Sequence, residues 1–145
     1  MNALPQFRGI GFALCFYHTN AELKTKEKTT FMTKKRKIQN YLDTKTNAQK
    51  CAFDFLLCDY LNGTLKMTLE SFGIKKISIY IDWSDHLKCI DIQGRYKKYF
   101  VESQIYPYEF SVAFDLIEAD DDITYPLGSK EQVYNVFSAT VESLK

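Results

Sequence analysis

Two stretches in which apolar residues alternate with polar or small ones constrain the fold of this chain more than any other feature. The apolar residues of the first stretch are Ile77, Ile79, Ile81 and Trp83. Those of the second are Tyr108, Phe110, Val112, Phe114 and Leu116. Because successive side chains of a strand point to opposite faces, each stretch is expected to form a β-strand that buries one face.

Turn residues divide the segment between these two strands into two further strands. A Ser84-Asp85 turn precedes a strand over residues 87–93, and Gly94 is expected to form the next turn. Another strand then covers residues 96–103, and Pro107 begins the last one. The sequence therefore predicts a four-stranded antiparallel β-meander.

A capped amphipathic helix is expected to close the chain. Ser129-x-x-Gln132 is a capping-box pattern, and Glu131 suits the positive N-terminus of a helix. One apolar stripe follows at helical spacing, formed by Val133, Val136, Phe137, Thr140, Val141 and Leu144. This C-terminal helix is expected to pack on the Ile/Phe face of the sheet.

The segment before the meander has helical patterns. Residues 34–43 carry one apolar ridge, which predicts a short amphipathic helix. Thr46-x-x-Gln49 is a second capping box, from which a largely buried helix is expected to run to the Asn62-Gly63 stop. Together with the meander, these helices indicate an α+β fold with N-terminal helices, a sheet and a C-terminal helix.

Residues 65–72 fit two patterns. Leu65, Met67 and Leu69 alternate as in a strand, whereas Leu65, Leu69 and Phe72 repeat as in a helix. Gly73 followed by Ile74 favours the helix, because a glycine after the last turn and an apolar contact back to Leu69 form a Schellman ending.

Residues 32–145 are expected to form a single α+β domain, a usual size for one hydrophobic core. Residues 1–31 differ in composition, since an apolar piece over residues 7–17 precedes a Lys/Thr-rich stretch. We interpret them as an N-terminal extension, either not native, with translation beginning at Met32, or a loosely attached segment whose apolar piece adds an edge strand. Mass spectrometry of the natively expressed protein tests the start site.

Composition and cysteine spacing favour a reduced, cytoplasmic protein without a cofactor. Cys15, Cys51, Cys58 and Cys89 form neither a C-x-x-C pair nor a zinc-knuckle spacing. The apolar piece at residues 10–17 is shorter than the roughly 20 residues that a membrane-spanning helix needs. We therefore expect no membrane association.

The polar cluster of Asp82, Asp85, His86 and Asp91 is the one grouping that suggests a metal site. Hairpin turns favour Asp for other reasons, so we assign neither a metal nor catalysis to this cluster. The six glycines form no phosphate-binding loop, which disfavours nucleotide-dependent enzymes. An enzyme is therefore the least favoured reading, although the sequence leaves it open.

Protein binding is the preferred functional reading, as a small interaction module of the inhibitor or immunity-like kind. Tyrosines bury large areas at modest entropic cost, and the polar face of the meander carries several. The expected binding residues are Tyr80, Asp82, Tyr96, Lys97, Tyr99 and Tyr108.

Nucleic-acid binding is the alternative. Two basic segments supply cations for phosphates, and rings beside the second could stack on bases. Their residues are Lys34, Lys35, Arg36 and Lys37 in the first segment, and Arg95 and Lys98 in the second. The net charge of +1 argues against this alternative. The sequence does not settle the oligomeric state.

Overall fold

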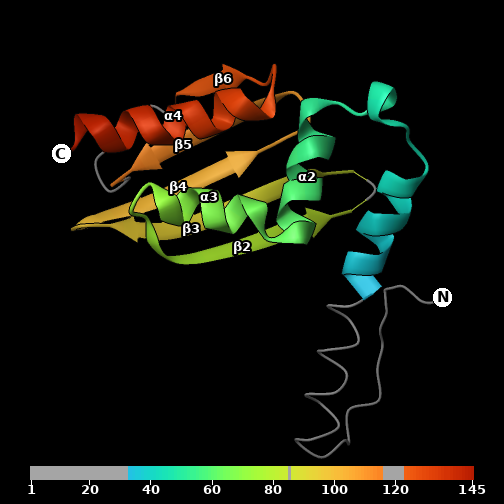
Figure 1. Cartoon of the computed structure of the whole chain (residues 1–145), viewed down its shortest axis with the longest axis horizontal. Helices are drawn as coiled ribbons and strands as arrows, with labels where there is room; N and C mark the ends of the chain where they lie inside the picture. The colour runs from blue at the N-terminus through green and yellow to red at the C-terminus, as the bar shows by residue number, and fades with distance from the viewer. Residues whose placement is uncertain (1–32, 85, 116–122) are drawn as a thin grey trace, which may run out of the picture. The chain divides into compact units, whose positions relative to one another are not determined.

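The computed structural model describes residues 33–84, 86–115 and 123–145 (Figure 1). Contacts divide the chain into two compact units, residues 1–35 and residues 36–145. The second unit contains the sheet and the helices discussed below. The edge strand expected within residues 7–17 lies outside the described residues.

The second unit has an α+β fold built on one antiparallel sheet, as expected. Its strands are β2 (Lys75–Trp83), β3 (Lys88–Tyr96), β4 (Tyr99–Ile105), β5 (Glu109–Phe114) and β6 (Thr124–Pro126). They lie in the order β2-β3-β4-β5-β6, so each strand pairs with its neighbour in sequence. The prediction of four strands was wrong by one, because β6 has only three residues, ends in a proline and shows no alternation.

The strand register aligns a row of apolar residues across one face of the sheet. Ile81 pairs with Ile90, Ile90 with Ile105, and Ile105 with Phe110. All four side chains are at most 2% exposed. The row continues to β6, where Tyr125 pairs with Phe110 and stacks on its ring at 5.2 Å.

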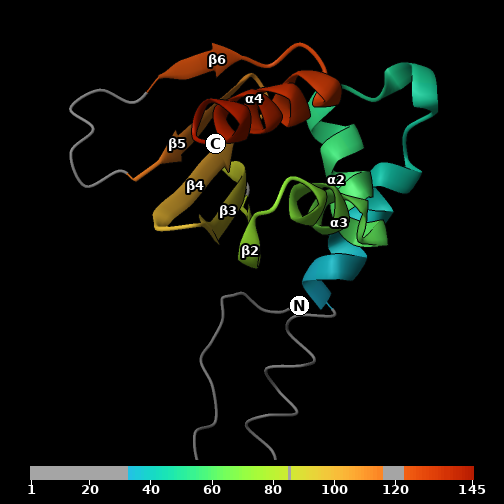
Figure 2. The same ribbon diagram turned by 60° about the vertical axis from the view of Figure 1, so that its left-hand side comes forward.

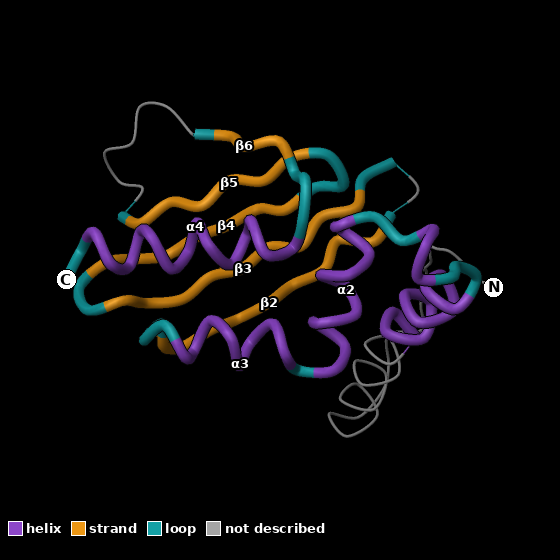
Figure 3. Tube along the Cα trace, turned by 45° about the horizontal axis from the view of Figure 1, so that its top comes forward, coloured by secondary structure: helices purple, strands orange, loops and turns teal. Residues whose placement is uncertain are grey.

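The helices of the second unit cover this apolar face. They are α2 (Ala52–Asn62), α3 (Thr64–Ser71) and α4 (Lys130–Ser143), preceded by helical residues 33–43 and a short 3₁₀ turn, η1 (Asn47–Gln49). Figures 2 and 3 show α2, α3 and α4 on the same side of the sheet. Val133, Phe137 and Val141 of α4 are buried in the core, which confirms the expected packing of the C-terminal helix.

The start of α2 differs from its prediction. The Thr46 and Gln49 capping box forms, but it caps only η1. A second capping box, between Cys51 and Asp54, begins α2 at Ala52. The sequence pattern hid this start because cysteine is an unusual N-cap residue, whereas threonine is a common one.

The helix prediction for residues 65–72 is confirmed. The backbone N–H groups of Gly73 and Ile74 donate to the carbonyl oxygens of Glu70 and Leu69, as a Schellman ending requires. Gly73 has a φ of 95°, in the left-handed region that favours glycine. This ending turns the chain from α3 directly into β2.

Gly94 does not form the turn predicted for it. It lies inside β3, where it pairs with Val101 of β4. A Cβ atom at this position would lie 2.9 Å from Cγ2 of Ile74 and 3.2 Å from the carbonyl oxygen of Lys75. Glycine is therefore needed for close packing, and the turn falls at residues 97–98.

Candidate functional site

The outer face of the sheet, opposite the helices, is not covered by any element among the residues that the structure describes. A polar row crosses it, because Tyr80 pairs with Asp91, Asp91 with Gln104, and Gln104 with Ser111. Tyr80 is 59% exposed. Asp82 lies on the same face and pairs with Cys89.

Cys89 and the Oδ1 atom of Asp91 are buried although both residues lie on this outer face. The Oδ1 atom of Asp91 is buried and has no hydrogen-bond partner, and burial raises the pKa of its carboxyl group. Burial, and then the nearby charge of Asp91, also raise the pKa of the Cys89 thiol. The thiol is therefore held protonated, which is the opposite of what a nucleophilic cysteine needs.

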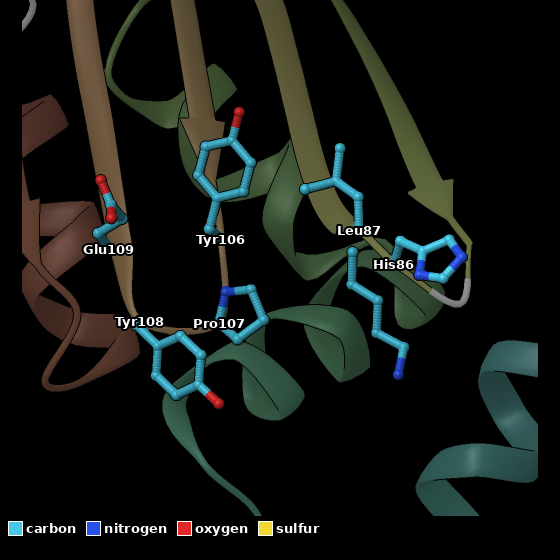
Figure 4. A pocket seen from close by; sticks show the side chains of 7 residues that line it. His86, Leu87, Tyr106, Pro107, Tyr108 and Glu109 are labelled. Carbon is cyan, nitrogen blue, oxygen red and sulfur yellow. The ribbon is translucent and has the colours of Figure 1, made fainter.

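A hollow of about 580 Å³ lies at one end of the sheet, where the β2–β3 and β4–β5 connections meet (Figure 4). We call it the Tyr108 hollow. Its lining residues are His86, Leu87, Lys88, Tyr106, Pro107, Tyr108 and Glu109. Tyr108 is 84% exposed and Leu87 is 45% exposed. Two of the exposed large hydrophobic side chains of the described residues thus share one hollow.

The Lys88 side of this hollow rests on an aromatic pair. The ring of Tyr41 meets the ring of Trp83 edge-on at 5.2 Å, and Nζ of Lys88 lies 4.9 Å from the centre of the Trp83 ring. Tyr41 is fixed in turn by Asp54, whose Oδ1 accepts a 2.8 Å hydrogen bond from the Tyr41 hydroxyl. This network connects the N-terminal helix to the β2–β3 end of the sheet.

Asp54 is fully buried and accepts further hydrogen bonds from Nζ of Lys45 at 3.0 Å and from the backbone N–H of Cys51 at 3.1 Å. Burial alone would raise the pKa of its carboxyl group, but the hydrogen bonds from Tyr41, Lys45 and Cys51 outweigh burial and lower the pKa. Asp54 therefore stays ionised, and its role is to hold the surrounding residues in place.

A second hollow, of about 640 Å³, lies at the opposite end of β3, and we call it the basic hollow. Its lining residues are Gly73, Lys75, Lys76, Arg95, Tyr96 and Lys97. Four of these six carry a positive charge, and none carries a negative one. Figures 1 and 3 show that the start of β2 and the β3–β4 turn, which supply these residues, lie at the same end of the sheet.

The structure does not bring the six expected binding residues to one surface. Tyr80 and Asp82 lie on the outer face, Tyr108 in the Tyr108 hollow, and Lys97 in the basic hollow. Tyr96 is 6% exposed and packs in the core, and Tyr99 pairs with it on the inner face. These two rings follow the inward alternation of β3 and β4, which the Gly94 turn prediction concealed.

Sequence analysis missed Leu87 in one hollow and Lys75 in the other. Lys75 contributes because it pairs with Arg95 across the sheet. Local sequence patterns do not predict such a contact, since it depends on the register between two strands.

Within the second unit, Arg36 and Lys37 of the first basic segment lie apart from Arg95 and Lys98 of the second. Arg36 and Lys37 precede Tyr41 on the helix that contacts Trp83, at the β2–β3 end of the sheet. Arg95 and Lys98 lie at the other end of β3, a strand about 26 Å long at roughly 3.3 Å per residue. Lys34 and Lys35 belong to the first unit.

The described residues contain no group of three or more His, Cys, Asp or Glu side chains that could hold a metal ion. Asp85 of the sequence-based cluster lies outside them. Cys51, Cys58 and Cys89 are free thiols. None of the helices in the described ranges has the length and apolar character needed to cross a membrane.

Comparisons of this chain with protein-family models, with curated proteins and with solved structures found no match. The functional argument therefore rests on the two hollows and the outer face.

Proposed function

We propose that the protein is a small non-enzymatic interaction module, of the inhibitor or immunity-like kind, that binds another protein through the Tyr108 hollow. The observation that carries this proposal is the convergence of Tyr108 and Leu87, both well exposed, on one concave site. Large apolar side chains that converge at a hollow are typical anchors of protein interfaces.

The rim of the Tyr108 hollow is polar, which suits a protein partner. His86 and Lys88 lie on one side and Glu109 on the other, so donors and an acceptor surround the apolar centre. An apolar centre with a polar rim is the usual anatomy of an interface. We infer that the partner inserts a large apolar side chain, and that its flanking polar groups pair with this rim.

The outer face extends the proposed surface. Tyr106 lines the hollow, and its hydroxyl donates a 3.3 Å hydrogen bond to Oε1 of Gln104, in the polar row of the outer face. A partner seated in the hollow can therefore continue over Gln104 towards Tyr80. The three free thiols fit a reducing, cytoplasmic setting for this interaction.

A cross-linked pull-down from the source cells tests the proposal. We expect a stoichiometric, nuclease-insensitive protein partner whose cross-links map to Tyr106, Tyr108 or Leu87. Tyr108→Ala should weaken the purified complex at least about tenfold, because interface tyrosines often contribute more than 1 kcal/mol.

Met67→Ala is the matched control, since Met67 is a large side chain, 68% exposed, on α3 and outside the hollow. The Met67→Ala variant should bind the partner with the same affinity as the unaltered protein. A complex that tolerates Tyr108→Ala and Leu87→Ser would refute the proposed site, and so would the absence of any cross-linked partner.

Nucleic-acid binding through both basic segments is the weaker candidate. The two segments would have to act from opposite ends of β3, and the second half of the chain is acidic. A single strand tracking both ends would pass acidic side chains on the way.

A further inference from the structure

We propose that the basic hollow is a binding site for a small molecule that carries a phosphate or diphosphate group. Lys75, Lys76, Arg95 and Lys97 would hold the anion. This inference goes beyond the proposed protein interaction, because the hollow lies at the other end of β3 from Tyr108.

Four cations from two segments that are distant in sequence converge on this hollow. Lys75 and Lys76 begin β2, Arg95 lies near the end of β3, and Lys97 occupies the β3–β4 turn. Like charges that gather without a lining carboxylate repel one another, which costs stability. A bound anion removes this repulsion and gains charge-assisted hydrogen bonds.

Two of the four cations are held in an unfavourable backbone conformation. Lys76 has a φ of 56° and Lys97 a φ of 53°, in the left-handed region that a residue with a Cβ atom rarely adopts. Lys76 sits at the irregularity in the β2–β3 register between Lys75 and Ser78. Glycine would suit both positions better for folding alone, and strained residues that cluster in one hollow indicate a functional constraint.

Aromatic rings hold two of the cationic groups near the hollow. The Arg95 guanidinium lies 5.5 Å from the centre of the Phe100 ring, and Nζ of Lys97 lies 5.6 Å from that of Tyr96. A guanidinium resting on a ring loses little conformational freedom when it binds, and its planar fork matches two phosphate oxygens. The cationic side chains are thus partly arranged before a ligand arrives.

The surroundings favour a compact anion over a long polyanion. The hollow has the volume of an ordinary small-molecule site. Close by, the backbone N–H of Asp115 donates to the carbonyl oxygen of Phe100, the residue on which Arg95 rests. The negative charge of Asp115 would repel a polyanion that extends past the hollow.

Calorimetric titration of the full chain with inorganic pyrophosphate tests the site. We expect saturable binding, and about a tenfold higher Kd for each of Lys76→Gly and Lys97→Gly, because one charged contact is lost. Both variants should keep or raise the melting temperature, since glycine accepts the left-handed conformation. If a variant binds pyrophosphate more weakly but is at least as stable as the unaltered protein, the loss of binding comes from the lost ligand contact and not from unfolding.

The double variant Arg36→Gln/Lys37→Gln is the control, because it removes two cations outside the hollow. It should bind pyrophosphate as the unaltered protein does. A nucleoside diphosphate that binds more tightly than pyrophosphate would support the site and show that its ligand is a nucleotide.

Three results would overturn the proposal. One is no saturable binding of pyrophosphate or nucleoside diphosphate up to about 10 mM. Another is equally tight binding of citrate, which would make the hollow a general anion site. The third is binding only to a single-stranded oligonucleotide of about 12 nucleotides, with loss on the Arg36/Lys37 substitutions.

Discussion

The buried carboxylate of Asp54 should be the most sensitive polar position of the fold, and Asp54→Asn tests this. The substitution keeps the shape of the side chain but replaces the charged carboxylate that accepts hydrogen bonds from Tyr41, Lys45 and Cys51. Breaking a buried ion pair costs about 3–5 kcal/mol. Lys45 is 30% exposed and can turn towards water, so we expect the lower end, about 3 kcal/mol. At roughly 4 °C per kcal/mol for a unit of this size, the melting temperature should fall by about 12 °C.

The stability that the Asp54 carboxylate contributes should depend on pH. The folded-state pKa of Asp54 is lowered, so its contribution is fully present above the unfolded value of about 3.9 and is lost as the pH falls through the folded value. Thermal unfolding followed by circular dichroism should therefore show a large difference between the two proteins at pH 7 and a smaller one below about pH 3.

Asp43→Asn is the matched control, since Asp43 is exposed and accepts a 2.8 Å hydrogen bond from Gln39, one turn earlier on the same helix. It should change stability by less than about 0.5 kcal/mol. The reasoning fails if Asp54→Asn costs less than about 1 kcal/mol at pH 7, or if the difference does not narrow in acid.

Two further substitutions test the sheet. Gly94→Ala should destabilise the fold by about 1–3 kcal/mol, because the new Cβ would press on Ile74 and on the Lys75 backbone. Urea unfolding should show a lower midpoint concentration with an unchanged dependence of the unfolding free energy on urea. Asp91→Asn should stabilise the fold by about 1 kcal/mol at pH 7, because burial disfavours the carboxylate and its Oδ1 has no partner. Burial raises the pKa of Asp91 in the folded protein, so the carboxyl group is protonated and uncharged below about pH 4. The stability gained by Asp91→Asn should therefore disappear when urea unfolding is measured below that pH. A gain that persists there would contradict the explanation.

Local sequence patterns predicted the features whose physical cause is local. Ser129 accepts a 3.1 Å hydrogen bond from the backbone N–H of Gln132 at the start of α4, as its capping pattern indicates. The Schellman ending at Gly73 was readable for the same reason, because it needs only residues within two turns of one another. Alternation located β2 and β5, since each buries one face.

Predictions failed where a distant contact decided the outcome. Gly94 looked like a turn, but Ile74 of the preceding connection leaves no room for a side chain there. Thr46 had the stronger capping signal, yet the buried Asp54 network fixes the start of α2 six residues later. The membership of both hollows depends on strand register in the same way, so residue types alone could nominate single residues such as Tyr108 and Lys97 but not which residues share a hollow.

The meander topology explains why the two proposed sites are independent. Connections β2–β3 and β4–β5 emerge at one end of the sheet, whereas the β3–β4 turn and the entry to β2 share the other. Residues 86–88 therefore meet residues 106–109, and residues 73–76 meet residues 95–97, although each pair is distant in sequence. The hollows are separated by the length of β3, about 26 Å at roughly 3.3 Å per residue, well beyond the range over which substitutions usually couple. Failure of protein binding would leave the anion site standing, and failure of pyrophosphate binding would leave the Tyr108 interface standing.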